Sequence, residues 1–143
     1  MINNIEWQHI RGSPRFHYPI DYWVAVISAN EETGQIDFLS KWEPHSYCHY
    51  HRHLGPTTTL VLEGEHHVVT PSQGNHVDVR TRGFFSNSPG GEQHMESGGP
   101  SGAVVLFSCQ AIEGGKLFDV LDDDGNVLAT ATINDFITGK IKG

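Results

Sequence analysis

The chain has 143 residues, of which 37% are hydrophobic and 18% are charged, and its formal net charge is −8. These values are typical of one folded domain with a hydrophobic core, here expected over residues 1–143, and they exclude a disordered chain. No cluster of lysine and arginine occurs, so nucleic acid and anionic membranes are not expected as partners. The unusual feature of the composition is its ten histidines.

The N-terminal sequence lacks the basic and apolar regions of a secretory signal peptide. No apolar run approaches the roughly 20 residues that a membrane-spanning helix needs. Cys48 and Cys109 form neither a C-x-x-C motif nor a disulfide framework, and we expect both to be small buried side chains. A cytoplasmic location follows as an expectation.

Short segments rich in β-branched and aromatic residues alternate with turn sequences rich in glycine, proline and asparagine along the chain. This pattern predicts many short strands, and therefore an all-β sandwich or barrel. The predicted strands cover residues 21–29, 35–42, 46–53, 57–70, 75–85, 92–97, 102–112, 116–122 and 126–132.

The segment LDDDGNV is predicted to be the hairpin turn before the last strand. It is not expected to be a calcium loop, because Val127 and Ile133 stand where such a loop requires glycine and glutamate. Only the tail, residues 133–143, has a helical pattern. We expect Asn134 or Asp135 to be the N-cap of this helix.

His49, His51 and His53 alternate along one predicted strand, so their side chains are expected on the same face. Two imidazoles at this spacing can bind one ion at roughly 2.0–2.2 Å each. A third ligand must then come from another segment, and the candidate is His94 in the sequence SPGGEQHMES. Imidazole ligands favour zinc, iron, copper or nickel over magnesium or calcium. The alternative interpretation is that the histidines form a polar outer face of the strand.

The sequence HRHLGPTTTLVLEGE, followed further along the chain by PGGEQH, resembles the two motifs of the cupin family. The first motif has a glutamate, which should fall at residue 57 or 58, but both positions are threonine. The resemblance therefore implies a metal site made of three histidines without a carboxylate. The residues that match the motifs are His51, His53, Gly64, Pro89, Gly90 and His94.

A three-histidine cupin resembles the dioxygenases that cleave acetylacetone and the 2,4'-dihydroxyacetophenone dioxygenases. The similarity covers roughly residues 45–140 and includes the DDDGNVLA hairpin. It implies a cupin-type β-barrel or jelly roll with a short C-terminal helix, and a homodimer or homotetramer. It also implies one divalent metal per chain, Fe(II) first, with zinc, nickel or manganese as alternatives. The implied activity is cleavage of a carbon–carbon bond in a β-diketone or hydroxy-ketone by O₂.

Further residues are candidates for the surroundings of this site. His49 is expected to be an extra ligand or to line the approach to the metal. Glu92 lies two residues before His94, so it is expected to orient a ligand or to bind the metal itself. The pocket should be apolar. The residues expected to line it are Thr58, Phe84, Phe85 and Phe107.

Two other classes of function fit the same motifs. One is a different metal-cupin enzyme, such as an isomerase or hydrolase, whose turnover would not require oxygen. The other is a non-enzymatic cupin that binds or senses a small molecule, similar to the zinc-binding cupin domains of anti-sigma factors. The expected helical segment for holding a sigma factor is not seen in this sequence. A binding protein would retain metal and ligand without turnover.

Overall fold

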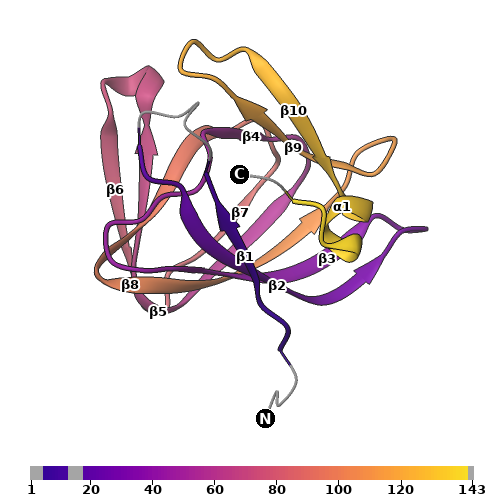
Figure 1. Cartoon of the computed structure of the whole chain (residues 1–143), viewed down its shortest axis with the longest axis horizontal. Helices are drawn as coiled ribbons and strands as arrows, with labels where there is room; N and C mark the ends of the chain where they lie inside the picture. The colour runs from indigo at the N-terminus through magenta and orange to yellow at the C-terminus, as the bar shows by residue number, and fades with distance from the viewer. Residues whose placement is uncertain (1–4, 13–17, 142–143) are drawn as a thin grey trace.

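The computed structural model describes residues 5–12 and 18–141, which form a curled antiparallel sheet and one short α-helix (Figure 1). The prediction of an all-β, cupin-type fold is confirmed. Along the main path of the sheet the order is β1-β2-β3-β8-β4-β9-β10, and β5 pairs with β6, β7 and β8. The elements are β1 (Gln8–Arg11), β2 (Asp21–Asn30), β3 (Gln35–Trp42), β4 (His51–His53), β5 (Thr57–Thr70), the 3₁₀ turn η1 (Pro71–Gln73), β6 (His76–Thr81), β7 (Phe85–Ser88), β8 (Gln93–Gln110), β9 (Lys116–Leu121), β10 (Val127–Thr132) and α1 (Ile133–Thr138).

Strand β8 connects the two parts of the curled sheet. Its later residues, 103–110, pair with β3, and most of its length pairs with β5. Its first residues pair instead with β4, where His94 lies directly opposite His51. The fold therefore brings the two halves of the histidine motif onto neighbouring strands.

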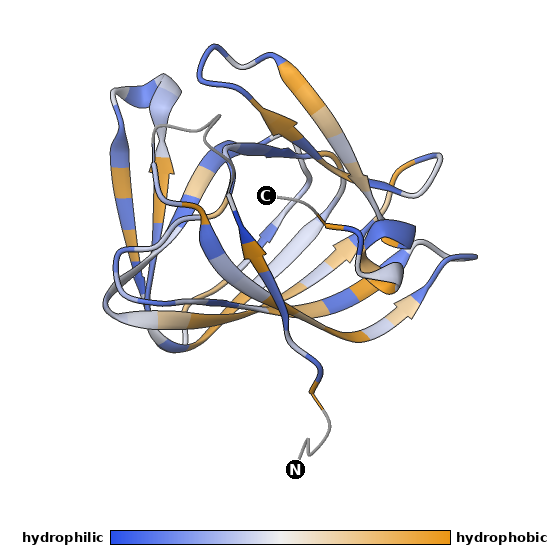
Figure 2. Cartoon of the chain, in the orientation of Figure 1, coloured by the Kyte–Doolittle hydropathy of each residue, from blue (hydrophilic) through white to orange (hydrophobic). Residues whose placement is uncertain are grey.

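The core lies inside the curl of the sheet. Inward and outward residues alternate along the strands, and Figure 2 shows this as alternating hydrophobic and hydrophilic segments. Phe38 stacks on Phe107 with ring centroids 5.4 Å apart and contacts Phe136 of the helix at 4.9 Å. Each fully buried side chain of this size contributes roughly 1.5–3 kcal/mol. The core therefore packs α1 against β3 and β8.

Most predicted strands occur with bounds within one or two residues, and three predictions are corrected. Residues 46–53 form a strand only at β4, since the preceding segment makes isolated bridges through Tyr47. Residues 75–85 divide into β6 and β7 at a turn where Gly83 has a φ of +89°. Residues 92–97 and 102–112 are one continuous strand, β8, because GGPSG forms a bulge and does not end the pairing.

Two further outcomes concern the ends of the chain. Strand β1 was not predicted from the sequence. The N-cap of α1 is Thr132 instead of Asn134 or Asp135, because Asp135 occupies the third helical position of a capping box with Thr132. Within the described part of the chain, no helix is long and apolar enough to cross a membrane.

Gly64 is required where β5 changes the face it presents to the core. Before this residue Thr57 and Val61 point inward, and after it His66 and Val68 do so. The pairing with β8 shifts register on both sides of Gly64. Its φ is +71°, and an added Cβ would lie 2.1 Å from the carbonyl oxygen of Gly102. The glycine therefore permits the bulge that turns the His66 side chain inward.

Candidate metal centre

Three histidine side chains converge inside the fold. His51 and His53 lie on β4 and His94 lies on the adjacent β8. The Nε2 atom of His53 is 3.2 Å from that of His51 and 3.0 Å from that of His94. All three residues are buried. The structure thus brings together the three histidines that the sequence motif singles out.

Hydrogen bonds to the other ring nitrogens fix how two of these imidazoles are protonated. The Nδ1 atom of His51 lies 2.7 Å from the backbone carbonyl oxygen of His49, which can only accept, so Nδ1 carries the proton. The Nδ1 atom of His53 lies 3.1 Å from the hydroxyl of Thr57, which itself donates to the carbonyl of Gly55. Both Nε2 atoms are therefore unprotonated in the neutral rings, as metal binding requires.

Glu96 is the fourth member of this group, and the sequence analysis did not identify it. One carboxylate oxygen lies 3.5 Å from Nε2 of His51 and the other lies 3.6 Å from Nε2 of His94. Glu96 is only 4% exposed. A carboxylate therefore lies beside the three histidines, which the sequence motifs did not predict. The glutamate that the first motif lacks is matched in chemistry by a glutamate of β8, two residues after His94 and on the same face.

The buried side chain of His66 holds Glu96 in place. The Nε2 atom of His66 lies 3.1 Å from Oε1 of Glu96, and His66 is fully buried. The ring of His66 stacks on Trp42 with centroids 5.3 Å apart. His66 belongs to neither of the two sequence motifs. Its inward direction follows from the bulge at Gly64, which the sequence pattern does not reveal.

The electrostatics of the cluster favour neutral imidazoles beside a charged carboxylate. Burial lowers the pKa of His94 to about 3 and holds the pKa of His53 well below its usual range. Burial alone would raise the pKa of Glu96, but the hydrogen bond from His66 and the surrounding histidines bring it well below the ordinary value. These are the protonation states of metal ligands.

The donor set fits a single divalent transition metal. One ligand atom from each of four residues lies within 4.8 Å of the others: His51, His53, His94 and Glu96, named here the His/Glu cluster. Unprotonated nitrogens only 3.2 Å apart repel each other unless a cation lies between them. Two nitrogens bound at right angles to one ion would lie roughly 3.0 Å apart, given bonds of about 2.1 Å. The cluster could therefore hold one metal ion.

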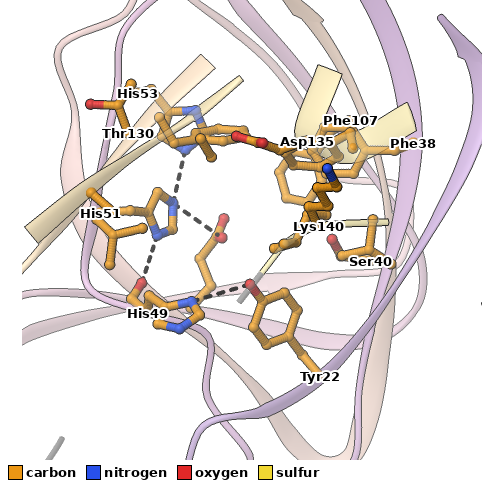
Figure 3. A pocket seen from close by; sticks show the side chains of 18 of the residues that line it. Tyr22, Phe38, Ser40, His49, His51, His53, Phe107, Thr130, Asp135 and Lys140 are labelled. Atoms are coloured by element: carbon orange, nitrogen blue, oxygen red, sulfur yellow. Dashed lines mark hydrogen bonds and ion pairs between the residues drawn. The ribbon is translucent and has the colours of Figure 1, made fainter. Parts of the chain in front are cut away.

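A cavity of about 200 Å³ adjoins the cluster. It is largely apolar, and Figure 3 shows Phe38 and Phe107 across it from the histidines. Three members of the His/Glu cluster line it, namely His51, His53 and Glu96. The part of its lining that follows β8 in the sequence is named here the C-terminal wall, formed by Phe118, Val120, Ala129, Thr130, Ala131, Asp135, Phe136, Lys140 and Ile141.

Two candidate ligands do not join the cluster. Within the described residues the group of metal-binding atoms includes neither His49 nor Glu92. His49 lines the cavity, and its Nδ1 atom lies 3.2 Å from the hydroxyl of Tyr22. Glu92 is half-buried and accepts a hydrogen bond from Ser88. Although Glu92 and His94 are close in sequence, Glu92 precedes β8 and is turned toward Ser88 at the end of β7.

Of the four expected pocket residues, Phe107 lines the cavity and the other three do not. Thr58 instead bonds to Asn87 on the outer face, because the inward positions of β5 at this point are its neighbours. Phe84 packs against the outside of the core under Arg80, and Phe85 is 59% exposed. The expectation is wrong for these three. For Thr58, a shift of one residue reverses the face of a strand. Phe84 and Phe85 lie just before and at the start of β7, which among the described strands pairs only with β5.

The fold and the buried His/Glu cluster define a cupin with a site compatible with metal binding. The sequence matches the ChrR Cupin-like domain family over residues 3–112, and the chain belongs to this family. The matched region contains the entire cluster and ends before the C-terminal wall. A comparison with curated proteins finds no match.

Solved structures with the same fold include an acetylacetone dioxygenase from Acinetobacter johnsonii. It is 16% identical, with a TM-score of 0.70, and the alignment covers 92% of this chain and 83% of that one. An RmlC-like cupin protein from Ralstonia eutropha JMP134 is 17% identical, with a TM-score of 0.71 and coverage of 96% and 80%. At these identities the likeness establishes the cupin fold.

Proposed function

We propose that this protein is a metal-dependent dioxygenase that cleaves a carbon–carbon bond beside a carbonyl group in a small β-diketone or hydroxy-ketone. The observation that carries the proposal is the buried His/Glu cluster facing a small apolar cavity. The fold shared with the Acinetobacter johnsonii acetylacetone dioxygenase supports it. We propose His51, His53, His94 and Glu96 as the ligands and Fe(II) as the resident metal.

The cavity suits a small substrate. A volume of about 200 Å³ lies below the roughly 300–1,000 Å³ of pockets that take drug-sized ligands. Phe38, Phe107 and Phe118 give it apolar walls that exclude water from a bound ketone. Since His51, His53 and Glu96 line the same cavity, a substrate inside it reaches the metal ligands.

The four side chains set the charge of the site. When bound, the divalent metal supplies Lewis-acid stabilisation of an enolate and electrons for oxygen. Glu96 neutralises part of its charge, which leaves one net positive charge for an anionic enolate. Because its pKa lies well below the usual range, Glu96 is a weak base, and we assign it to metal binding instead of proton abstraction.

The test combines metal content with oxygen uptake. Protein purified without a chelating column is analysed by mass spectrometry for metal per chain, then reloaded anaerobically with Fe(II) and mixed with acetylacetone in an oxygen electrode. We expect uptake that depends on Fe(II) and yields a carboxylic acid. His51→Ala and His94→Ala should lose both metal and uptake, while His76→Ala, an exposed histidine on β6, should keep both. Unchanged uptake in both cluster variants, or none in the reloaded wild type, would refute the proposal.

A second candidate function is a non-catalytic zinc cupin that binds a small molecule. The specific observation in its favour is the fourth protein donor, Glu96, since sites closed by four protein ligands are typical of structural zinc. This candidate predicts tightly held zinc and no oxygen uptake after iron loading. The experiment above separates the two candidates directly.

A further inference from the structure

We propose that Tyr22, positioned by His49, donates a hydrogen bond to an oxygen atom of the ligand that binds at the His/Glu cluster. The inference rests on the metal site of the proposed function and adds the group that recognises the ligand. It predicts a ligand with a hydrogen-bond acceptor oxygen beside its metal-binding oxygen, such as a carbonyl compound that chelates through two oxygens.

Tyr22 lies on β2, and its side chain reaches the cavity beside the cluster. It is 9% exposed and lines the same cavity as His51 and Glu96. Figure 3 shows its hydroxyl directed toward His49, next to His51 and away from the Phe38 side of the pocket. Tyr22 and His49 thus bring polar atoms to the end of the cavity beside the cluster.

The contact between Tyr22 and His49 leaves a proton for a ligand. The hydroxyl lies 3.2 Å from Nδ1 of His49. When Nδ1 carries the imidazole proton, it donates to the tyrosine oxygen, and the hydroxyl proton is then available to an acceptor in the cavity. A ligand oxygen in front of Tyr22 favours this tautomer because both hydrogen bonds form together. Burial raises the pKa of Tyr22 well above its ordinary value, so the hydroxyl keeps its proton.

Trp42 provides a second, independent observation at the same wall. Its ring stacks on Tyr22 with centroids 6.4 Å apart, and Trp42 also lines the cavity. Its Nε1 atom is buried and has no hydrogen-bond partner in the part of the chain that the structure describes. An indole N–H can only donate. Tyr22 and Trp42 are thus neighbouring side chains of the cavity lining that can each donate a hydrogen bond.

The surroundings favour a neutral or metal-neutralised oxygen over a free carboxylate. Val24, Phe38 and Phe107 give the cavity an apolar border. Lys140 also lines the cavity, but Asp135 lines it too, so the two together supply no net positive charge for a second negative group. Burial of an unpaired carboxylate is strongly unfavourable, whereas a carbonyl needs only its hydrogen bond. The donors and the apolar border together select a carbonyl-type oxygen.

The experiment uses acetohydroxamic acid, a small two-oxygen chelator that binds divalent metals without turnover. Its dissociation constant is measured from the visible spectrum of the Co(II)-loaded protein. Tyr22→Phe removes only the hydroxyl, and we expect it to weaken binding about five- to tenfold. The affinity for Co(II), measured by competition with a chromophoric chelator, should not change. Tyr47→Phe, a tyrosine outside the cavity, should bind as the wild type does.

Substitution of His49 tests the positioning role. His49→Ala should weaken hydroxamate binding about as much as Tyr22→Phe, and His49→Asn, whose amide can still donate to Tyr22, should restore part of it. Equal hydroxamate binding by the wild type and Tyr22→Phe would overturn the inference. So would no binding by the Co(II)-loaded wild type, or a loss of Co(II) affinity in Tyr22→Phe that accounts for the whole effect.

The outcome is distinguishable from that of the proposed function. Hydroxamate binding requires only a metal in the cluster and an open cavity. If the iron-loaded protein consumes no oxygen while Tyr22→Phe still weakens the probe, the dioxygenase proposal fails and the role of Tyr22 stands. If oxygen uptake occurs but Tyr22→Phe binds the probe normally, the dioxygenase proposal stands and the role of Tyr22 fails.

Discussion

The two sides of the cavity are built in different ways. The His/Glu cluster comes from β4 and the beginning of β8, where ladder pairing sets His51 opposite His94 and every member is buried. The C-terminal wall comes mainly from β9, β10 and α1, and several of its residues, including Thr130 and Lys140, are exposed. The family match, over residues 3–112, contains the first region and none of the second. We infer that the cluster defines the chemistry, that Tyr22 recognises the ligand oxygen and that the C-terminal wall limits the size of the ligand.

The largest effect should follow from changing the residue that directs β5 toward the cluster. Gly64→Ala should lower the free energy of unfolding by more than about 3 kcal/mol, because it combines a left-handed φ with a clash against Gly102. Gly74→Ala is the matched control, since Gly74 has a φ of +67° but no atom within 4 Å of an added Cβ. It should cost only about 1–2 kcal/mol. Urea unfolding measures the free energy of unfolding of both variants. Similar losses of free energy would show that the structure relaxes around the Cβ added at Gly64.

Glu96 should matter most for metal affinity. Glu96→Gln keeps the size of the side chain but removes the charge, and we expect metal affinity to fall by about 100-fold. Competition with a chromophoric chelator measures this effect. Glu92→Gln is the control, because Glu92 bonds to Ser88 and lies outside the cluster. Equal affinities for the two variants would show that the metal is held by the histidines alone.

Much of the cluster could be predicted from the sequence, because alternation along a strand is a local rule. It placed His51 and His53 on one face, and the same rule applied to His94 would have indicated Glu96. The cupin family has its carboxylate in the first motif, where this chain has threonine, so Glu96 was not predicted. The involvement of His66 could not be predicted, because a bulge depends on the partner strand.

The pocket was harder to predict than the cluster for a related reason. Thr58 was assigned to the cavity, whereas Thr57 and Thr59 are the buried residues. Hydrophobic alternation that is interrupted by several threonines does not define which face is inside. The C-terminal wall depends on how β9, β10 and α1 pack on distant strands. The all-β class and the hairpin turn, by contrast, followed from turn sequences that act locally.

Thr57 should have an intermediate effect on the cluster. Its hydroxyl accepts a hydrogen bond from His53 and so holds the metal-binding nitrogen of that ring unprotonated. Thr57→Val keeps the shape but removes this acceptor, and we expect metal affinity to fall about tenfold. Thr58→Val, on the outer face, is the control and should leave the affinity unchanged. A wild-type affinity in Thr57→Val would mean that the ring is oriented by packing alone.

The smallest effect, and the one specific to the C-terminal wall, should come from Ala131. Ala131 lines the cavity from β10. Ala131→Leu fills part of the space, so kcat/KM for a bulky diketone should fall about fivefold more than for acetylacetone, in line with the discrimination that a pocket achieves through a few methylenes. Metal affinity should not change, because the substitution touches no member of the cluster. Leu128→Ala, on the same strand but outside the cavity, should alter neither quantity. If Ala131→Leu slowed both substrates equally, the wall would not discriminate by size, and ligand selection would have to lie on the cluster side of the cavity.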